Sequence, residues 1–244
     1  MGLNYTLDNG YGAARLGLIV LTTDETLENE ARGCVAGRAV SLLHARIPAQ
    51  PHVTPEALAT MEGHMEAVAG SLPAGLDVVG YGCTSGATVI GPAQVEALIR
   101  RAQPGAAVTN PLSAVIAALD VLGARRIGLL TPYVDSVNAP LVAALGQAGI
   151  EVVTRASFEQ SDDWSVARIP ESDTLRGMET LVETGGCEAI FASCTNLRAF
   201  GIVDEAEARL GIPVISSNLA LVWHMLRLAG LEAKGWGPGR LFQL

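Results

Sequence analysis

Two cysteine–threonine pairs carry the most reactive side chains of the sequence. The segment Val79-Gly-Tyr-Gly-Cys83-Thr-Ser is similar to Ile190-Phe-Ala-Ser-Cys194-Thr-Asn. Each cysteine follows a short apolar run that is typical of a buried strand. A thiolate in a strand-to-helix loop is stabilised by backbone N–H groups and the helix dipole, which lower the thiol pKa and keep the group reactive near neutral pH. Cys83 and Cys194 are therefore the candidate catalytic residues.

Two opposed cysteines permit two kinds of reaction without a cofactor. In racemisation, one cysteine removes an α-proton and the other delivers a proton to the opposite face of the same carbon. In cis–trans isomerisation, one cysteine adds to an activated double bond, the adduct rotates, and elimination gives the other isomer. Thr84, Ser85, Thr195 and Asn196 add hydroxyl, amide and N–H groups that suit a carboxylate. The residues alone leave both reactions open.

The two cysteine loops belong to a longer internal repeat. Arg15-Leu-Gly17-Leu-Ile-Val resembles Arg126-Ile-Gly128-Leu-Leu-Thr. Gly17 and Gly128 are 111 residues apart, and so are Cys83 and Cys194. A weaker echo pairs Asn110 with Asn218 at the shorter offset of 108 residues. Two landmarks at one offset predict a duplicated unit.

Short β-branched runs alternate with longer amphipathic stretches in both halves of the repeat. Strands are predicted over Leu16–Leu21, Val78–Gly82, Ala107–Thr109, Ile127–Thr131, Glu151–Thr154, Ala189–Ala192 and Val214–Ser216. Helices are predicted over Glu25–Leu43, Pro55–Ala69, Ala93–Ala102, Pro111–Leu122, Ala139–Ala148, Asp173–Thr184 and Leu219–Ala229, with Pro55, Pro111 and Pro140 in first turns. This alternation is typical of α/β folds with parallel sheets.

We therefore expect two duplicated Rossmann-like subdomains, related by a pseudo-twofold axis. Residues 1–112 form the first half with the Cys83 loop, and residues 113–218 form the second half with the Cys194 loop. Residues 219–244 form a C-terminal helix that packs back on the first half. Because functional loops lie at the carboxyl ends of parallel strands, both Cys-Thr loops should meet in the cleft between the halves.

Composition narrows the classes of partner and compartment. The 244 residues are 49% hydrophobic and 17% charged, with a net charge of −9. That acidity argues against nucleic acid or an anionic membrane as a partner. No basic-then-apolar leader and no apolar run of about 18 residues is seen, so we expect a cytoplasmic protein. Four cysteines without metal-ligand spacing predict reduced thiols and no metal site. A small carboxylate substrate is the expected partner, and a homo-oligomer is compatible with the sequence.

The sequence resembles the aspartate/glutamate racemase superfamily, in the branch that contains maleate cis–trans isomerases, arylmalonate decarboxylases and ectoine-utilisation A proteins. The resemblance covers almost the whole chain and implies a pair of doubly wound subdomains with the active site between them. It rests on Thr23-Asp24-Glu-Thr-Leu-Glu28, Gly82-Cys83-Thr-Ser-Gly86, Thr131-Pro-Tyr133, Val166-Ala-Arg168-Ile169 and Ser193-Cys194-Thr-Asn-Leu197.

The resemblance also carries differences that bear on the substrate. Arylmalonate decarboxylases use only the second-half cysteine, so Cys83 counts against that activity. Maleate isomerases keep both cysteines and a tyrosine at Tyr133, but they have asparagines at Asp24 and, in an ungapped alignment, at Asp163. One residue of slippage would move the second position to Asp162. Ionised aspartate only accepts hydrogen bonds and repels a carboxylate, so these replacements favour a substrate with an ammonium group.

The sequence therefore predicts a cofactor-independent isomerase or racemase of a small carboxylic acid, an amino or diamino acid, similar to ectoine-utilisation A proteins. Cys83 and Cys194 are the expected catalytic residues. The expected substrate-binding residues are Asp24, Thr84, Ser85, Tyr133, Asp163, Thr195 and Asn196, although Asp24 also suits a helix N-cap. Maleate isomerisation, arylmalonate-type decarboxylation and a non-enzymatic ligand sensor are the alternatives, and no metal is expected.

Overall fold

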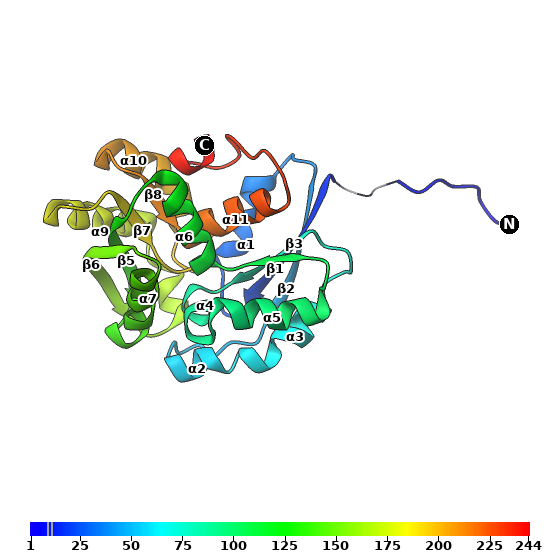
Figure 1. The fold of residues 1–244 in the computed structure, drawn as a ribbon, viewed down its shortest axis with the longest axis horizontal. Coiled ribbons are helices and arrows are strands. Elements are labelled where there is room, and N and C mark those ends of the chain that lie inside the picture. The colour runs from blue at the N-terminus through cyan, green and yellow to red at the C-terminus, as the bar shows by residue number, and fades with distance from the viewer. Residues whose placement is uncertain (9, 11) are drawn as a thin grey trace.

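The computed structural model describes residues 1–8, 10 and 12–244 and contains two four-stranded parallel sheets of equal topology. The first sheet has the order β2-β1-β3-β4 and the second the order β6-β5-β7-β8. The two sheets lie at opposite sides of the view in Figure 1, with helices packed around each. This duplicated α/β architecture confirms the predicted fold class. The strands are β1 (Ala14–Leu21), β2 (Val40–Ile47), β3 (Val78–Gly82), β4 (Ala107–Thr109), β5 (Arg126–Tyr133), β6 (Glu151–Gln160), β7 (Ala189–Ala192) and β8 (Val214–Ser216).

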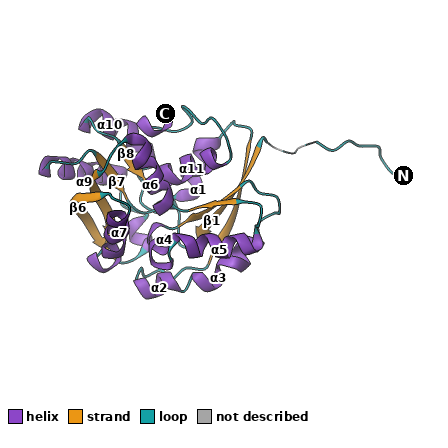
Figure 2. Ribbon diagram, viewed as in Figure 1, coloured by secondary structure: helices purple, strands orange, loops and turns teal. Residues whose placement is uncertain are grey.

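Helices follow most strands, as parallel connections require (Figure 2). They are α1 (Leu27–Val35), α2 (Pro55–Ala59), α3 (Glu62–Gly70), α4 (Thr84–Ile90), α5 (Pro92–Ala102), α6 (Pro111–Leu122), α7 (Asp135–Gln147), α8 (Asp163–Val166), α9 (Glu171–Thr184), α10 (Val203–Leu210) and α11 (Ser217–Leu228), with 3₁₀ turns η1 (Phe200–Ile202) and η2 (Arg240–Gln243). None of the helices described is both long and apolar enough to cross a membrane.

Helices α6 and α11 lie next to each other near the middle of the molecule. Each begins right after the last strand of its sheet, and a polar side chain caps each start: Asn110 accepts from the Ser113 N–H and Ser216 from the Leu219 N–H. Helix α11 follows the second sheet but also contacts β3 and β4 of the first. The α6–α11 pair therefore joins the two halves into one packed core.

The buried central strands place the functional loops at one edge of each sheet. Every residue of β3 is buried, and so is every residue of β7. Gly82 pairs with Val20 at the end of β3, and Ala192 pairs with Leu130 at the end of β7. Strand β3 therefore ends just before Cys83 and β7 just before Ser193 and Cys194, at the carboxyl ends of equivalent inner strands in the two sheets.

The expected helix over Glu25–Leu43 is wrong in its second half. Helix α1 ends at Val35, Gly37 takes a positive φ of 71°, and the chain continues as β2 beside β1. The first six residues of β2 are all half-buried, so they lack the alternation that marks a strand. An apolar run of this kind does not distinguish helix from strand by period alone. Tertiary pairing with β1 decides it.

Three other boundaries also differ from the sequence prediction. Helix α7 starts at Asp135, so Pro140 lies inside the helix rather than in its first turn. The segment Pro55–Ala69 is two helices separated by Thr60 and Met61. Strand β6 continues to Gln160 instead of ending at Thr154. These errors follow from end signals that were too weak to locate boundaries.

Gly82 should be sensitive to any side chain because α1 packs directly on the end of β3. A Cβ there would overlap the side chain of Leu27 and lie 3.0 Å from the Ile19 carbonyl oxygen. We expect Gly82→Ala to lower the free energy of unfolding by ~1–3 kcal/mol. Gly63→Ala is the matched control, because nothing lies near its added Cβ and it sits in α3; it should stabilise by ~0.5–1 kcal/mol. Urea unfolding measures both, and equal effects would contradict the packing argument.

Candidate active site

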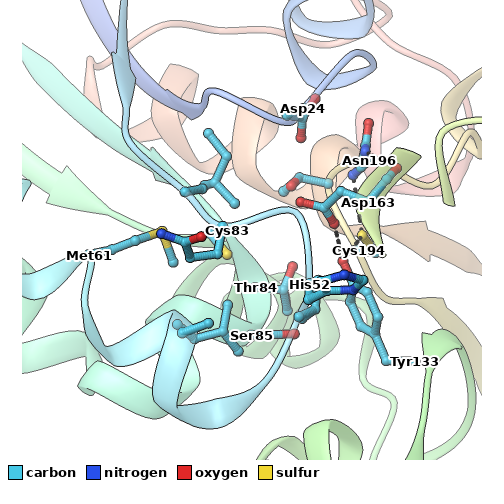
Figure 3. A pocket seen from close by; sticks show the side chains of 17 residues that line it. Asp24, His52, Met61, Cys83, Thr84, Ser85, Tyr133, Asp163, Cys194 and Asn196 are labelled. Atoms are coloured by element: carbon cyan, nitrogen blue, oxygen red, sulfur yellow. Dashed lines mark hydrogen bonds between the residues drawn. The ribbon is translucent and has the colours of Figure 1, made fainter. Parts of the chain in front are cut away.

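One pocket lies between the carboxyl ends of the two sheets, and all nine predicted site residues line it (Figure 3). Its residues from the first half are Leu21, Asp24, Ala49, Gln50, His52, Val53, Ala57, Leu58, Met61, Cys83, Thr84 and Ser85. Those from the second half are Tyr133, Asp163, Cys194, Thr195 and Asn196. The structure thus brings the two Cys-Thr loops together, as the repeat predicted.

Cys83 is positioned by the start of α4. It is the N-cap residue of this helix, and its Sγ accepts a hydrogen bond of 3.2 Å from the Gly86 N–H. The N–H groups of Thr84 and Ser85 belong to the first turn, where a helix supplies no acceptor of its own. These groups, with the thiol beside them, are suited to hold a carboxylate next to Cys83.

Cys194 lies in a different backbone setting. Its backbone φ is +145°, a conformation that residues other than glycine rarely adopt. Its N–H donates to Ser217 Oγ at 3.0 Å. The next helical turn begins only at Phe200. Both cysteines therefore lie in loops that lead from a strand to a helix, but only Cys83 stands directly at the start of the helix. Backbone strain of this kind persists where surrounding bonds fix the loop.

Tyr133 connects Cys194 to Asp163. The Tyr133 hydroxyl donates to Asp163 Oδ1 at 2.9 Å and lies 3.1 Å from Cys194 Sγ, and Thr23 donates to the other carboxylate oxygen. With its own proton directed at Asp163, the Tyr133 oxygen accepts from the Cys194 S–H. The three groups form a chain along which a proton can move between the thiol and the carboxyl group.

The structure settles which of the neighbouring aspartates faces the pocket. Asp163 is 3% exposed, and its backbone is held by the Pro51 carbonyl and by the side-chain amide of Asn196. Asp162 instead caps α8 at the surface through the Ser165 N–H. The ungapped alignment that placed Asp163 at the site was therefore correct in register.

The two carboxylate oxygens of Asp24 have different surroundings: one caps a helix, and the other has no hydrogen-bond partner among the described residues. Its Oδ1 accepts from the N–H groups of Thr26 and Leu27, both at 2.8 Å, and so caps the start of α1. Its Oδ2 is buried and has no hydrogen-bond partner in the described part of the chain. Burial raises the pKa of this carboxyl group. The two interpretations of Asp24, helix cap and ligand contact, are compatible with each other.

Three predicted binding side chains are engaged in bonds within the protein. Thr84 Oγ1 pairs with Ser217 Oγ at 2.8 Å, and Thr195 donates to the Gly82 carbonyl at 3.3 Å. Asn196 accepts from the Glu25 N–H and donates to the Asp163 carbonyl. All but the bond from Asn196 to Asp163 cross between the two halves, and together they hold the pocket in shape. Ser85 and the first-turn N–H groups of α4 are better placed to meet a carboxylate.

The electrostatic environment opposes thiolate formation, contrary to the expectation of lowered thiol pKa values. Burial raises the pKa of Cys83 to about 12. Burial and the nearby Asp163 charge raise the pKa of Cys194 as well. None of the described lining residues is lysine or arginine. One N–H bond to each sulfur does not offset the loss of water, so the pocket favours the neutral form of both thiols.

Sequence reasoning missed Ser217, Thr23 and His52. Ser217 supports both cysteine loops, because its hydroxyl meets Thr84 and the Cys194 N–H. Its position after β8 is a signal, since polar strand ends recur at the same edge. His52 lines the pocket and pairs with Asp162 across an isolated bridge, which no local pattern indicates. His224 lies on α11, pairs with the Thr109 hydroxyl and does not line the pocket.

The described residues contain no group of three histidine, cysteine, aspartate or glutamate side chains arranged to hold a metal ion. The pocket is lined by two thiols, two carboxyl groups, a phenol and residues of the first turn of α4. Such groups can add a sulfur to a carbon or move protons on a bound carboxylate.

Comparison with known proteins matches this geometry to one family. The family model described as arylmalonate decarboxylase matches residues 16–242. The maleate isomerase of Nocardia farcinica is 28% identical over 242 residues, covering 95% of this chain and 96% of the relative. The arylmalonate decarboxylase of Bordetella bronchiseptica is 35% identical over 147 residues, covering 58% and 60%. A solved Nocardia farcinica maleate cis–trans isomerase, a cysteine-to-serine mutant with a covalently bound succinylcysteine intermediate, has a TM-score of 0.85 at 26% identity and covers 94% of this chain and 98% of that one.

Removing the Asp163 charge should make Cys194 more reactive. The ionised carboxylate raises the pKa of Cys194, and an asparagine side chain in its place would keep an acceptor for the Tyr133 hydroxyl. We expect Asp163→Asn to speed iodoacetamide alkylation of Cys194 near pH 8, by about tenfold for each pKa unit by which the thiol falls. Peptide mass spectrometry measures the rate. Asp162→Asn, at the surface one residue away, should leave it unchanged, and an unchanged rate in Asp163→Asn would refute the assignment.

Proposed function

Since the chain belongs to the arylmalonate decarboxylase family, we propose that it is a cis–trans isomerase of a small unsaturated carboxylate of the maleate type, acting through two cysteines without a cofactor. The observation that carries the proposal is that Cys83 and Cys194 line one pocket from opposite halves of the fold. A substrate carbon held between them has a sulfur on each side. This arrangement supports isomerisation over decarboxylation by a single cysteine.

The comparisons support the isomerase alternative among the related activities. Relatives of both kinds span nearly the whole chain, since a maleate isomerase aligns over 95% of it and a solved arylmalonate decarboxylase covers 95%. What favours the isomerase is a cysteine in both halves of the pocket, together with the covalent chemistry of a related isomerase. In the Nocardia farcinica isomerase a cysteine carries a succinyl group. A covalent route through a cysteine therefore has a precedent on this fold, and we propose the same kind of step here.

In the proposed reaction Cys83 is the nucleophile. A carboxylate of the substrate takes the proton of the Cys83 thiol and returns it to the sulfur at the end of the cycle. The Cys83 sulfur adds to one carbon of the double bond, and the displaced π electrons take a proton from the Cys194 thiol at the adjacent carbon. The resulting saturated adduct rotates about its central C–C bond. Cys194 then removes the proton again, the double bond re-forms, and the C–S bond to Cys83 breaks. No net proton or electron is consumed.

The two cysteine environments support this division of roles. The Gly86 N–H points at Cys83 Sγ and stabilises negative charge on the attacking sulfur. Tyr133 lies against Cys194 Sγ and links it to Asp163, which suits a thiol that gives up and regains a proton. The first-turn N–H groups of α4 would hold the substrate carboxylate beside Cys83, and Ser85 would assist.

A second candidate is isomerisation or racemisation of an amino or diamino acid. The observation that favours it is the pair of buried carboxyl groups, Asp24 and Asp163, in a pocket whose described lining residues include no lysine or arginine. The unpartnered Oδ2 of Asp24 would accept from an ammonium group. With a maleate-type dianion, these carboxyl groups would repel the substrate until they are protonated, and burial raises the pKa of both.

We expect the native protein to convert maleate to fumarate, and proton NMR monitors the conversion. We expect Cys83→Ser and Cys194→Ser each to lower kcat by about a hundredfold or more, because each removes an essential group. Cys194→Ser should accumulate a substrate adduct on Cys83, visible by mass spectrometry, and Cys83→Ser should form none. Cys187→Ser, outside the pocket lining, is the control and should retain activity. If the native protein left maleate unchanged, the proposed function would be wrong. If the adduct formed on Cys194 instead of Cys83, the assignment of roles would be wrong.

Substituting Asp24 should separate the two candidate substrates. Asp24→Asn keeps an oxygen for the Thr26 and Leu27 N–H groups but removes a negative charge from the pocket. With maleate we expect kcat/KM to rise, by up to about tenfold, because repulsion of the dianion falls. With an ammonium-bearing substrate kcat/KM should fall.

The assays are fumarate formation and α-proton exchange of aspartate and 2,4-diaminobutyrate in heavy water. Asp135→Asn, 91% exposed, is the control. Exchange that Asp24→Asn abolishes would favour the second candidate.

A further inference from the structure

The loop that carries Cys194 depends on side-chain bonds for its shape. Residues 193–199 form neither helix nor strand, and Cys194 has its unusual positive φ within them. The first part of the loop lines the pocket, and the last part leads into η1 at Phe200. Any group that fixes both parts also sets the position of the Cys194 sulfur.

Glu30, which does not line the pocket, is bonded to both parts of this loop. It lies on α1 of the first half. Its Oε1 accepts from the Phe200 N–H at 3.3 Å, and its Oε2 accepts from Asn218 Nδ2 at 2.6 Å. The same Asn218 nitrogen donates to the Thr195 carbonyl at 2.8 Å. One carboxylate therefore holds the end of the loop directly and its Cys194–Thr195 start through Asn218.

The orientation of the Asn218 amide makes this link sensitive to the charge of Glu30. Both neighbours of Asn218 Nδ2 are acceptors, so the nitrogen must face them. That leaves Asn218 Oδ1 buried without a partner in the described structure. A protonated Glu30 would present an O–H beside this unpaired carbonyl. Turning the amide to accept that proton would direct Oδ1, an acceptor, at the Thr195 carbonyl and break the bond.

We propose that Glu30 is a positioning residue: its ionised carboxylate fixes Asn218 so that the amide anchors Thr195, and its protonation releases the Cys194 loop. The proposal rests on the proposed function in one respect, that Cys194 takes part in catalysis. It adds a residue outside the pocket that controls whether this thiol is correctly placed.

The surroundings of Glu30 bring this change of charge close to neutral pH. Burial raises the pKa of Glu30 to about 7, against the lowering effect of Asn218 and the N–H groups of Ala199 and Phe200. The charged group that faces it from the loop after β1 is Asp24, whose negative charge raises the pKa further. Activity should therefore rise as pH increases through about 7, where Glu30 ionises and the loop becomes fixed.

Glu30→Gln tests the proposal because it keeps the size of the side chain and mimics the uncharged state. Its amide has one acceptor oxygen where the carboxylate has two, so it must lose the bond to Asn218 Nδ2 or the bond to the Phe200 N–H. We expect kcat with maleate to fall by about ten- to a hundredfold near pH 8, the range for losing a bond to a charged group, with little change in KM. The step in kcat near pH 7 should disappear. Glu96→Gln, an exposed glutamate of α5, should show the native profile.

A second measurement is independent of turnover. The rates of iodoacetamide alkylation of Cys194 and Cys83 are compared in the same molecule by peptide mass spectrometry from about pH 6 to about pH 8. The ratio of the Cys194 alkylation rate to the Cys83 alkylation rate should change near pH 7 in the native protein and in Glu96→Gln. In Glu30→Gln this ratio should show no step. Asn218→Ala should also remove the step. A step that persists in Glu30→Gln would overturn the proposal. A step that vanishes there while the native protein leaves maleate unchanged would refute the proposed substrate and support the positioning role.

Discussion

The burial of two thiols and two carboxyl groups in one small pocket is the constraint on which the structure depends. Cys83, Cys194, Asp24 and Asp163 are each 6% exposed or less, and no lysine or arginine stands among the described lining residues to balance a negative charge. Buried charge without a partner is costly, so these groups must be neutral or hydrogen-bonded. Most of the bonds that satisfy them lie within one half, but Asp163 also accepts from Thr23 of the other half. The bonds of Thr84, Thr195 and Asn196 cross between the halves beside the pocket and hold the halves in alignment.

Much of this could be predicted from the sequence because duplication leaves a signal that local propensity does not. One spacing of 111 residues fixed Cys83 and Cys194 at equivalent strand ends, and parallel sheets place such ends at their functional edges. Asp24 lies just after β1, and Tyr133 is the last residue of β5, the equivalent strand of the second sheet, so both reach the pocket for the same reason. The roles of these residues in catalysis stay predictions, since position alone does not show reactivity.

The remainder could not be predicted because it depends on contacts between distant segments. Strand β2 has a local pattern that also suits a helix, and only its pairing with β1 defines it. Asn110 and Asn218 form a weak sequence echo but have different contacts, since Asn110 caps α6 while Asn218 bonds Glu30 and Thr195. The thiol pKa values were misjudged because backbone N–H groups are visible in a motif, whereas exclusion of water by the opposite half is not.

The two cysteine loops share a sequence pattern but not a structure, and this difference gives the pocket a direction. Cys83 receives an N–H from the first turn of α4, an arrangement that accommodates negative charge on sulfur. Cys194 has no helix directly after it and instead contacts the Tyr133 hydroxyl, an arrangement that accommodates proton exchange. A symmetrical pair of thiols would give two equivalent attackers. Because one half kept the helix start and the other lost it, the same residue type can serve as nucleophile on one side of the substrate and as acid and base on the other.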